Sequence, residues 1–284
     1  YMPQSVQVTY GAQYQDTQIG AVTEGALNAY NDLVAGRGGD AIGQLKNIST
    51  DVELHVSEKG IYIQGMDTSQ VCLFECNLKN DWFDTFEVEE HDVERLAVST
   101  GIAAKVMATR AGDQIVTLEA DTESEKLSMS FTGVVDIYDK HFELPLMEIE
   151  SETMNVPNNE SDVDLVLPSK NFTELISQFE IFDDTLSLTF TEEEIVMKAS
   201  GDDGSMSTTM KLEDVSEYAI GEGEEVKQSF ALRYIKMMSA FGKLANEVSM
   251  EFGEGQPLRL KYIMSTEDEE SYIRFFLAPK ISDD

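Results

Sequence analysis

Alternating apolar and polar residues predict β-strands along most of this chain, and the strand pattern occurs twice. Residues 60–67 (GIYIQGMD) match residues 194–201 (EIVMKASG), and residues 115–131 match residues 248–264, at a spacing of about 134 residues. Each member of the second pair reads as two alternating strands around a polar turn. A repeat of this length is typical of duplicated domains and is too long for the units of a solenoid.

Stretches with helical spacing of apolar residues accompany these strands. The four predicted helices lie at residues 41–48, 101–110, 169–179 and 231–244. Four helices are too few to cover both faces of the sheets, which favours helices on one face of antiparallel sheet. The predicted fold class is therefore α+β, built from two similar halves.

The duplication also predicts the domain organisation. We expect one half at residues 28–146 and the other at residues 165–284. Residues 147–164 lie between them, and because this stretch carries six acidic residues and no basic one, it reads as an exposed connector. Residues 1–27 are polar, lie outside the duplication and are treated as an N-terminal extension of unknown role.

The charged residues are unevenly distributed along the chain. The chain has 20 basic and 54 acidic residues and a net charge of −34, so as a whole it should repel a polyanion. Seven of the basic residues nevertheless fall in the four predicted helices, where Glu174 is the single acid. These are Lys46, Lys105, Arg110, Lys170, Arg233, Lys236 and Lys243. Such stripes suggest a surface that holds nucleic acid, although apolar helices that simply contain few acids would have the same composition.

The last predicted helix has two distinct sides. Arg233, Lys236 and Lys243 are spaced by three and seven residues, which places them on one stripe. The apolar residues of the same helix can face a sheet instead; they are Leu232, Ile235, Phe241 and Leu244. A helix of this kind can lie across phosphates without entering a groove, so its contact with DNA would not depend on base sequence.

The inventory of reactive residues argues against an enzyme. The three histidines, His55, His91 and His141, do not stand in a metal-ligand spacing, and the chain contains no GxSxG, GxxxxGK[ST] or GxGxxG motif. We therefore predict no catalytic residues, no metal and no cofactor. The two cysteines, Cys72 and Cys76, suit a reducing compartment without a disulfide framework.

Several segments in order along the chain resemble the DNA sliding clamps of the proliferating cell nuclear antigen family. They are GIYIQGMDTSQVCLF at 60–74, FDTFEV at 83–88, IVTLEAD at 115–121, LPS and the following helix at 167–179, SFALRYIK at 229–236 and FFLAPKI at 275–281. The resemblance covers roughly residues 28–284 and is closer to eukaryotic or eukaryotic-viral clamps than to archaeal ones. It implies two clamp domains per subunit, in a ring of three subunits with sheets outside and helices lining the lumen.

The resemblance assigns roles to further residues. The seven helical cations would face duplex DNA in the lumen, and Tyr138 and Phe142 would lie in the subunit interface, which joins strands near 137–145 and 204–212. Glu174 stands where the family usually has a lumen arginine, and Glu192 stands where eukaryotic clamps carry a lysine that is modified by ubiquitin.

A second implied site takes short peptides of polymerases, ligases and nucleases, whose apolar and aromatic side chains enter a pocket under the connector. Its matching positions are Met66, Gln70, Val71, Met154, Val156, Pro157, Pro257, Phe276, Ala278, Pro279, Lys280 and Ile281. Further implied partners are a clamp loader and two more copies of the chain, with no membrane, in the nucleus or at a site of viral DNA replication. The alternative is an acidic protein that mimics DNA or chaperones basic proteins.

Overall fold

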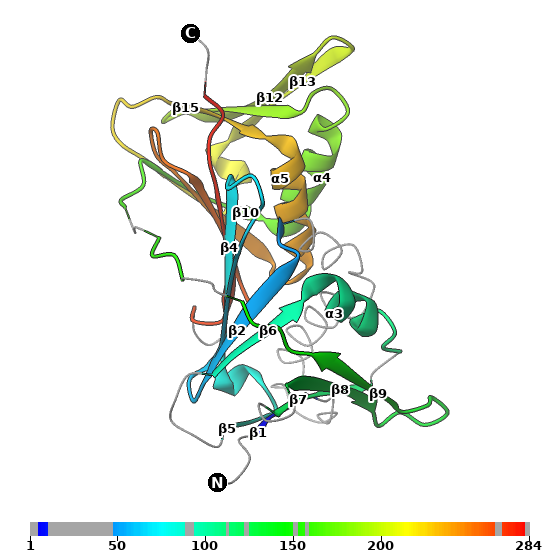
Figure 1. Cartoon of the computed structure of the whole chain (residues 1–284). Helices are drawn as coiled ribbons and strands as arrows, with labels where there is room; N and C mark the ends of the chain where they lie inside the picture. Colours follow the sequence, from blue (N-terminus) through cyan, green and yellow to red (C-terminus); the bar gives the residue numbers. More distant parts are fainter. Residues whose placement is uncertain are drawn as a thin grey trace. The chain divides into compact units, whose positions relative to one another are not determined.

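The computed structural model describes residues 5–10, 48–88, 94–111, 114–121, 125–149, 153–156, 159–264 and 269–281. The chain forms two compact units (Figure 1). The first consists of Tyr1–Thr68, Glu75–Thr153 and Met264–Ile273, and the second of Ser69–Phe74, Met154–Ile263 and Arg274–Asp284. The break at residues 153 and 154 falls inside the predicted connector, and short segments from elsewhere in the chain complete each unit.

The first unit contains most of the strands of the first half. Its elements are β1 (Ser5–Tyr10), β2 (Asp51–Ser57), β3 (Gly60–Met66), β4 (Cys72–Lys79, whose first three residues group with the second unit), a 3-10 turn η1 (Asn80–Trp82), β5 (Thr85–Val88), β6 (Glu94–Ser99), α3 (Thr100–Met107), β7 (Ile115–Asp121), β8 (Lys126–Thr132) and β9 (Lys140–Pro145). One sheet has the order β5-β1-β7-β8-β9, and β4-β3-β2-β6 are consecutive neighbours in another. Helix α3 contacts β2, β6 and β9.

The second unit follows the same plan. Its elements are β10 (Val163–Pro168), α4 (Ser169–Phe179), β11 (Thr185–Phe190), β12 (Glu194–Gly201), β13 (Gly204–Lys211), a 3-10 turn η2 (Leu212–Asp214), β14 (Glu217–Ile220), β15 (Val226–Ala231), α5 (Leu232–Ser239), a 3-10 turn η3 (Ala240–Lys243), β16 (Glu247–Phe252), β17 (Leu258–Ile263) and the larger part of β18 (Tyr272–Leu277). Strands β13-β12-β11-β15 form one sheet, and β14-β10-β16-β17 are consecutive neighbours in another.

The pairing of strands confirms the duplication. The matched segments at residues 60–67 and 194–201 are β3 and β12, which pair with β2 and β11 respectively. The segments at 115–131 and 248–264 contain the hairpins β7–β8 and β16–β17, as predicted. The α+β prediction is therefore confirmed, with antiparallel sheets and three α-helices among the described residues.

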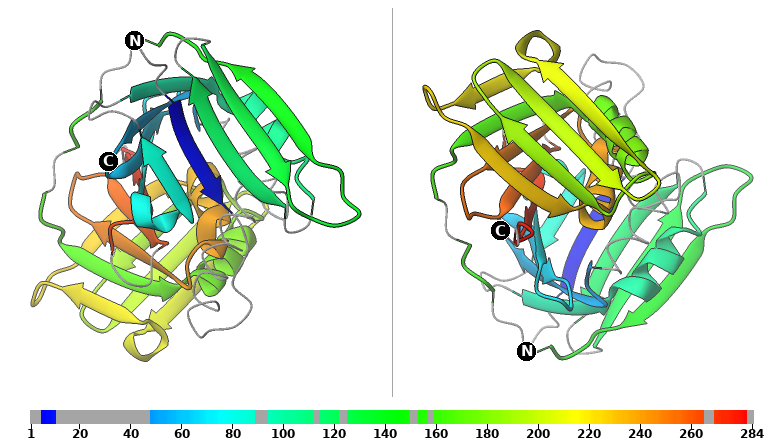
Figure 2. Two further views of the ribbon diagram at one scale, coloured as in Figure 1. Left: turned by 90° about the horizontal axis from the view of Figure 1, so that it is seen from below. Right: turned by 90° about the horizontal axis from the view of Figure 1, so that it is seen from above.

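Strand β1 corrects one prediction. It pairs antiparallel with β5 and β7, and in the second unit β10 pairs in the same way with β14 and β16 (Figure 2). Residues 5–10 are thus the first strand of the first half, and the prediction that they lie outside the duplication is wrong. A six-residue strand carries too short a pattern to be matched by sequence. Its spacing also differs from that of its counterpart, because 40 residues separate β1 from β2, whereas 16 separate β10 from β11.

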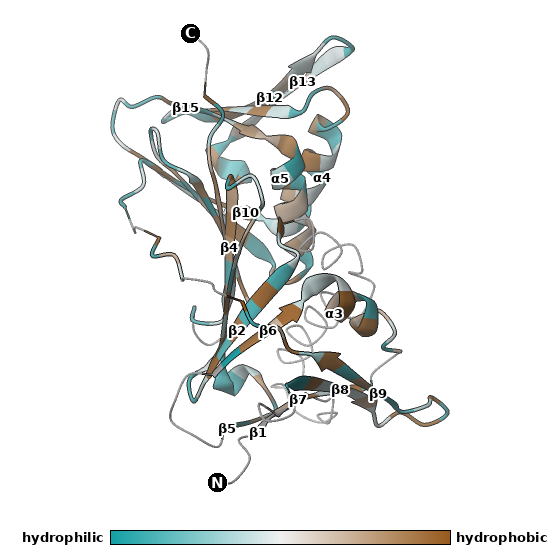
Figure 3. Ribbon diagram, viewed as in Figure 1, coloured by the Kyte–Doolittle hydropathy of each residue, from teal (hydrophilic) through white to brown (hydrophobic). Residues whose placement is uncertain are grey.

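The helices of the second unit pack by burying one side. Phe172, Ile176 and Phe179 recur along α4 at helical spacing, and each exposes 1% of its surface or less. Figure 3 shows the resulting alternation of apolar and polar residues along α4 and α5. In the part of the chain that the structure describes, no helix is long and apolar enough to cross a membrane.

Candidate nucleic-acid and partner interfaces

The exposed side of α4 and α5 carries a group of cations. Side chains of Lys170, Arg233, Lys236 and Lys243 are all exposed, and for the last three the spacing predicts this. The predicted apolar side of α5 and η3 is buried, with exposures of 6% or less; it consists of Leu232, Ile235, Phe241 and Leu244. The sequence-predicted division of this helix into a basic and an apolar side is therefore confirmed, although its last turn is a 3-10 turn.

Close packing holds α4 and α5 together (Figure 1). The Thr173 hydroxyl donates to the Ser239 carbonyl oxygen across the two helices at 2.9 Å. Gly242 lies against the same hydroxyl, because a Cβ built at Gly242 would lie 2.8 Å from Thr173 Oγ1. A larger residue at 242 would push η3, which carries Lys243, away from α4.

Local contacts restrain two of these cations. The Arg233 guanidinium lies 4.6 Å from the centre of the Tyr234 ring and donates to the Tyr234 hydroxyl at 3.0 Å. Lys236 forms an ion pair with Glu180, the residue that follows α4. Both members of this ion pair are more than 40% exposed, so water screens the interaction and the ammonium remains available to a phosphate. Glu174, exposed on α4, lowers the positive charge of this surface.

The remaining predicted DNA-facing residues belong to the first half. Lys105 is exposed in the last turn of α3. Arg110 is 8% exposed, and its Nε donates to the Gln114 carbonyl oxygen at 2.7 Å, so it is not a solvent-facing cation as predicted. The chain turns after α3 and carries the Arg110 side chain back onto the backbone. Lys46 lies outside the described residues.

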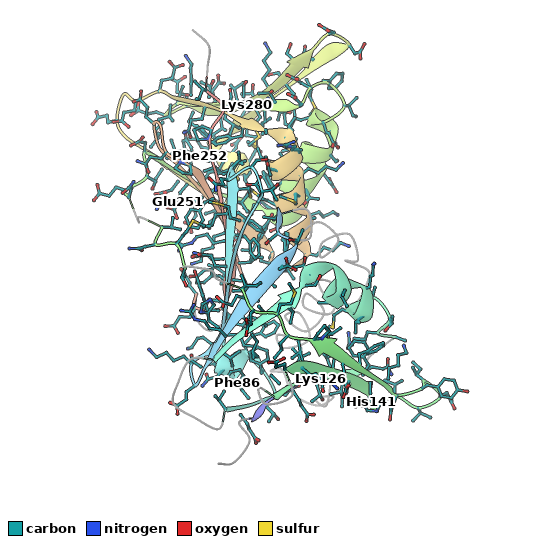
Figure 4. All side chains as sticks on the ribbon, viewed as in Figure 1. Phe86, Lys126, His141, Glu251, Phe252 and Lys280 are labelled. Atoms are coloured by element: carbon teal, nitrogen blue, oxygen red, sulfur yellow. The ribbon has the colours of Figure 1, made fainter. Side chains whose placement is uncertain are left out.

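The C-terminal segment, residues 278–281, is anchored in the second unit. The Ala278 amide donates to the Val71 carbonyl oxygen at 3.0 Å, and the Lys280 amide donates to the Ser229 carbonyl oxygen at 2.7 Å. The Lys280 side chain is labelled in Figure 4. Its ammonium binds Asp184 at 3.0 Å and also the Thr185 hydroxyl. The Thr185 hydroxyl and the Lys280 ammonium hold the pKa of the Asp184 carboxyl below its ordinary value of 3.8.

Most of the predicted partner-peptide residues in the second unit reach the surface. Gln70, Met154, Pro257, Ala278, Lys280 and Ile281 are exposed, and Val71, Val156 and Pro279 are half-buried. Phe276 is 6% exposed and packs in the core, with the Arg274 guanidinium 4.9 Å from its ring centre, and its place in the peptide pocket stays a prediction. Met66 is half-buried in the first unit, and Pro157 lies outside the described residues.

Sequence reasoning missed a polar residue that supports this region. The Gln228 amide nitrogen donates to the carbonyl oxygens of Gly253 (2.7 Å) and Gln256 (3.2 Å), and thereby holds the β16–β17 turn that carries Pro257. Gln228 occupies an inward position of β15 between Val226 and Phe230. A polar residue at an inward strand position signals a buried hydrogen bond, and this alternation was available in the sequence.

Six strands stand at the ends of their sheets among the described residues, namely β5, β6, β9, β13, β14 and β15. Two of them, β9 in the first unit and β13 in the second, coincide with the predicted interface segments. Phe142 on β9 is half-buried against Phe131, with ring centres 5.6 Å apart, whereas Tyr138 in the preceding turn is 91% exposed. Unpaired main-chain groups on such an edge are available to pair with another strand.

Two family models match consecutive parts of the chain. One, described as the N-terminal domain of proliferating cell nuclear antigen, matches residues 40–154, and the model of its C-terminal domain matches residues 155–280. The chain belongs to the proliferating cell nuclear antigen family. It is 28% identical over 239 residues to "Proliferating cell nuclear antigen 2" of Drosophila melanogaster. These residues cover 84% of this chain and 92% of the fly protein. The family matches support a sliding clamp, a processivity factor of DNA replication and repair.

Proposed function

We propose that this clamp encircles duplex DNA and tethers a polymerase, a ligase and a nuclease to it. The observation that carries the proposal is the exposed cationic side of α4 and α5 on a chain whose net charge is −34. Phosphate contacts from such a surface are independent of base sequence. Many weak contacts permit sliding, whereas tight contacts to base edges would hold the protein at one site.

Ring closure is proposed to occur through β9 and β13. In the second unit, the Ser69–Phe74 segment that begins β4 lies beside the end of β18, as the bond from the Ala278 amide to the Val71 carbonyl illustrates. By order in the duplicated plan, β18 is the counterpart of β9 and β4 is the counterpart of β13. The same pairing between β9 of one copy and β13 of the next would therefore join two strands that each stand at the end of a sheet. Such a head-to-tail contact forms a closed ring when its rotation closes, here with three copies.

Partner peptides are proposed to bind around the anchored C-terminal segment. Exposed Met154 and half-buried Val156 would supply an apolar wall, and the segment's main chain would supply hydrogen bonds. Methionine adapts its shape to different side chains, which suits a surface that serves several partners. The protein is proposed to be non-enzymatic, to be loaded by a clamp loader and to act in the nucleus.

A mass measurement under native conditions tests the proposed ring. A homotrimer has three times the chain mass of 31.7 kDa. The alternative, an acidic protein that mimics DNA or chaperones basic proteins, does not require three copies. A monomer at micromolar concentration would therefore contradict the proposed clamp.

The DNA surface is tested by replacing Lys105, Arg233 and Lys236 together with Glu. All three side chains are exposed, so the fold should survive, while loading onto DNA or stimulation of a polymerase should fall. Normal polymerase stimulation by the folded triple variant would contradict the proposed DNA contact.

A further inference from the structure

Lys280 has two roles in the C-terminal segment that its sequence context does not reveal. Its amide bonds the Ser229 carbonyl on β15, and its ammonium reaches the Asp184 carboxylate and the Thr185 hydroxyl at the start of β11. β11 and β15 are paired strands, with Thr185 opposite Ala231. One residue of the segment is thus joined to two neighbouring strands of the same sheet.

We propose that Asp184 and Thr185 are positioning residues, which act through Lys280 to hold the C-terminal segment in the conformation that binds a partner peptide. This inference rests on the proposed function. It assigns the Lys280 side chain to an anchor within the chain, whereas the sequence had placed it among the residues that contact the peptide. The carbonyl groups of Ala278 and Pro279, between the two main-chain anchors, would then be the acceptors offered to an extended peptide.

Burial alone does not hold this segment in place. Ala278 is exposed, Pro279 is half-buried and Ile281 is 93% exposed. The end of a chain is usually poorly ordered unless specific contacts tie it down. Polar contacts must therefore supply the order that apolar packing supplies elsewhere in the second unit.

The anchor is more than a single ion pair. The side chains of Lys280 and Asp184 are 38% and 83% exposed, and an isolated pair of this kind contributes little. Here the Lys280 ammonium also contacts the Thr185 hydroxyl, and the Lys280 amide donates a hydrogen bond to Ser229 on β15. The depressed pKa of the Asp184 carboxyl, caused first by Thr185 and then by Lys280, agrees with this arrangement. Fixing the segment before the peptide arrives reduces the ordering cost of binding.

The test combines peptide affinity with hydrogen exchange on the full-length protein. The probe is a fluorescein-labelled clamp-binding peptide of a DNA polymerase, with a scrambled peptide as control. We expect Asp184→Asn to weaken binding about threefold, and the double variant with Thr185→Val about fivefold, as for the loss of a partly exposed charged contact. The Lys280 amide should exchange faster in both variants. Glu222→Gln removes one exposed negative charge from the β14–β15 turn and should change neither quantity.

A double-mutant cycle separates positioning through Lys280 from a general effect on the fold. If Asp184 acts through Lys280, Asp184→Asn should have no further effect on affinity in a Lys280→Met background. Additive effects would overturn the positioning role, as would unchanged affinity and unchanged Lys280 exchange in Asp184→Asn. If the wild-type protein binds no peptide, the proposed peptide site itself is wrong, and faster Lys280 exchange in Asp184→Asn would then report only an anchor without a binding role.

Discussion

Replacing Glu174 with Arg should strengthen the hold of this clamp on DNA. Glu174 is exposed on α4 one turn after Lys170, so the two side chains lie on the same side of the helix. The substitution changes the charge of this surface by two units per chain, or six in a ring of three. Glutamate and arginine have similar helix propensities, so the fold should be unaffected.

The size of the effect follows from Coulomb's law. A unit charge about 10 Å from a phosphate in water gains about 0.4 kcal/mol. Screening at about 0.1 M salt reduces this to roughly 0.15 kcal/mol, because the Debye length is then about 10 Å. Six charges contribute about 1 kcal/mol in total, which corresponds to roughly fivefold tighter association.

Fluorescence anisotropy with labelled duplex DNA measures this association over a range of salt concentrations. The slope of log affinity against log salt should become steeper in Glu174→Arg, because additional phosphates are neutralised. Glu193→Arg is the matched control, since Glu193 is exposed in the β11–β12 turn and not on a helix. If the two variants show the same affinity and salt slope, α4 does not approach the duplex, which contradicts the predicted DNA contact.

Three further outcomes are expected. Phe142→Asp should release monomers, seen as a loss of mass in native mass spectrometry, because it places a charge on the β9 edge; a stable trimer at micromolar concentration would exclude this edge from the interface. Val156→Ser should weaken a polymerase peptide about tenfold in calorimetry with the trimer intact, as for a buried apolar anchor; unchanged affinity would place the peptide elsewhere. The Cys76 thiol should resist iodoacetamide at pH 8 until the protein is denatured, because burial and the neighbouring Glu75 raise its pKa to about 12; rapid alkylation of the native protein would contradict this.

Acid should release the C-terminal anchor, because protonation of the Asp184 carboxylate removes its ion pair with Lys280. The pH range in which this happens follows from the Asp184 pKa. That pKa is lowered below 3.8 in the folded protein, so the carboxylate contributes stability above the unfolded value and loses it as pH falls through the folded value. We expect the protection of the Lys280 amide against hydrogen exchange to be constant between pH 8 and pH 5, after the rates are corrected for the intrinsic pH dependence of exchange. A loss of protection within that interval would mean that another group controls the anchor.

Much of the architecture could be predicted because periodicity reports which side of an element is buried. The two sides of α5 follow directly from the spacing of Leu232, Ile235, Arg233 and Lys236, and burial agrees at each position. The hairpins at 115–131 and 248–264 were likewise evident from alternation and a polar turn.

Other features depend on contacts between residues that are far apart in the chain. β1 could not be recognised, because a six-residue strand acquires its place from pairing with β5 and β7 rather than from its own pattern. Arg110 was assigned to the DNA-facing surface from charge and composition, yet packing buries it.

A reader of the sequence can infer the duplication, the α+β class, the cationic side of the helices and the family. Each is a local or repeated property that periodicity, charge or motif expresses directly. The folded structure is needed to show which strands end their sheets, where Ser5–Tyr10 belongs and what Lys280 contacts. Pairing and hydrogen bonding join groups separated by up to about two hundred residues, as Ala278 and Val71 are, and no local pattern encodes such a choice of partner.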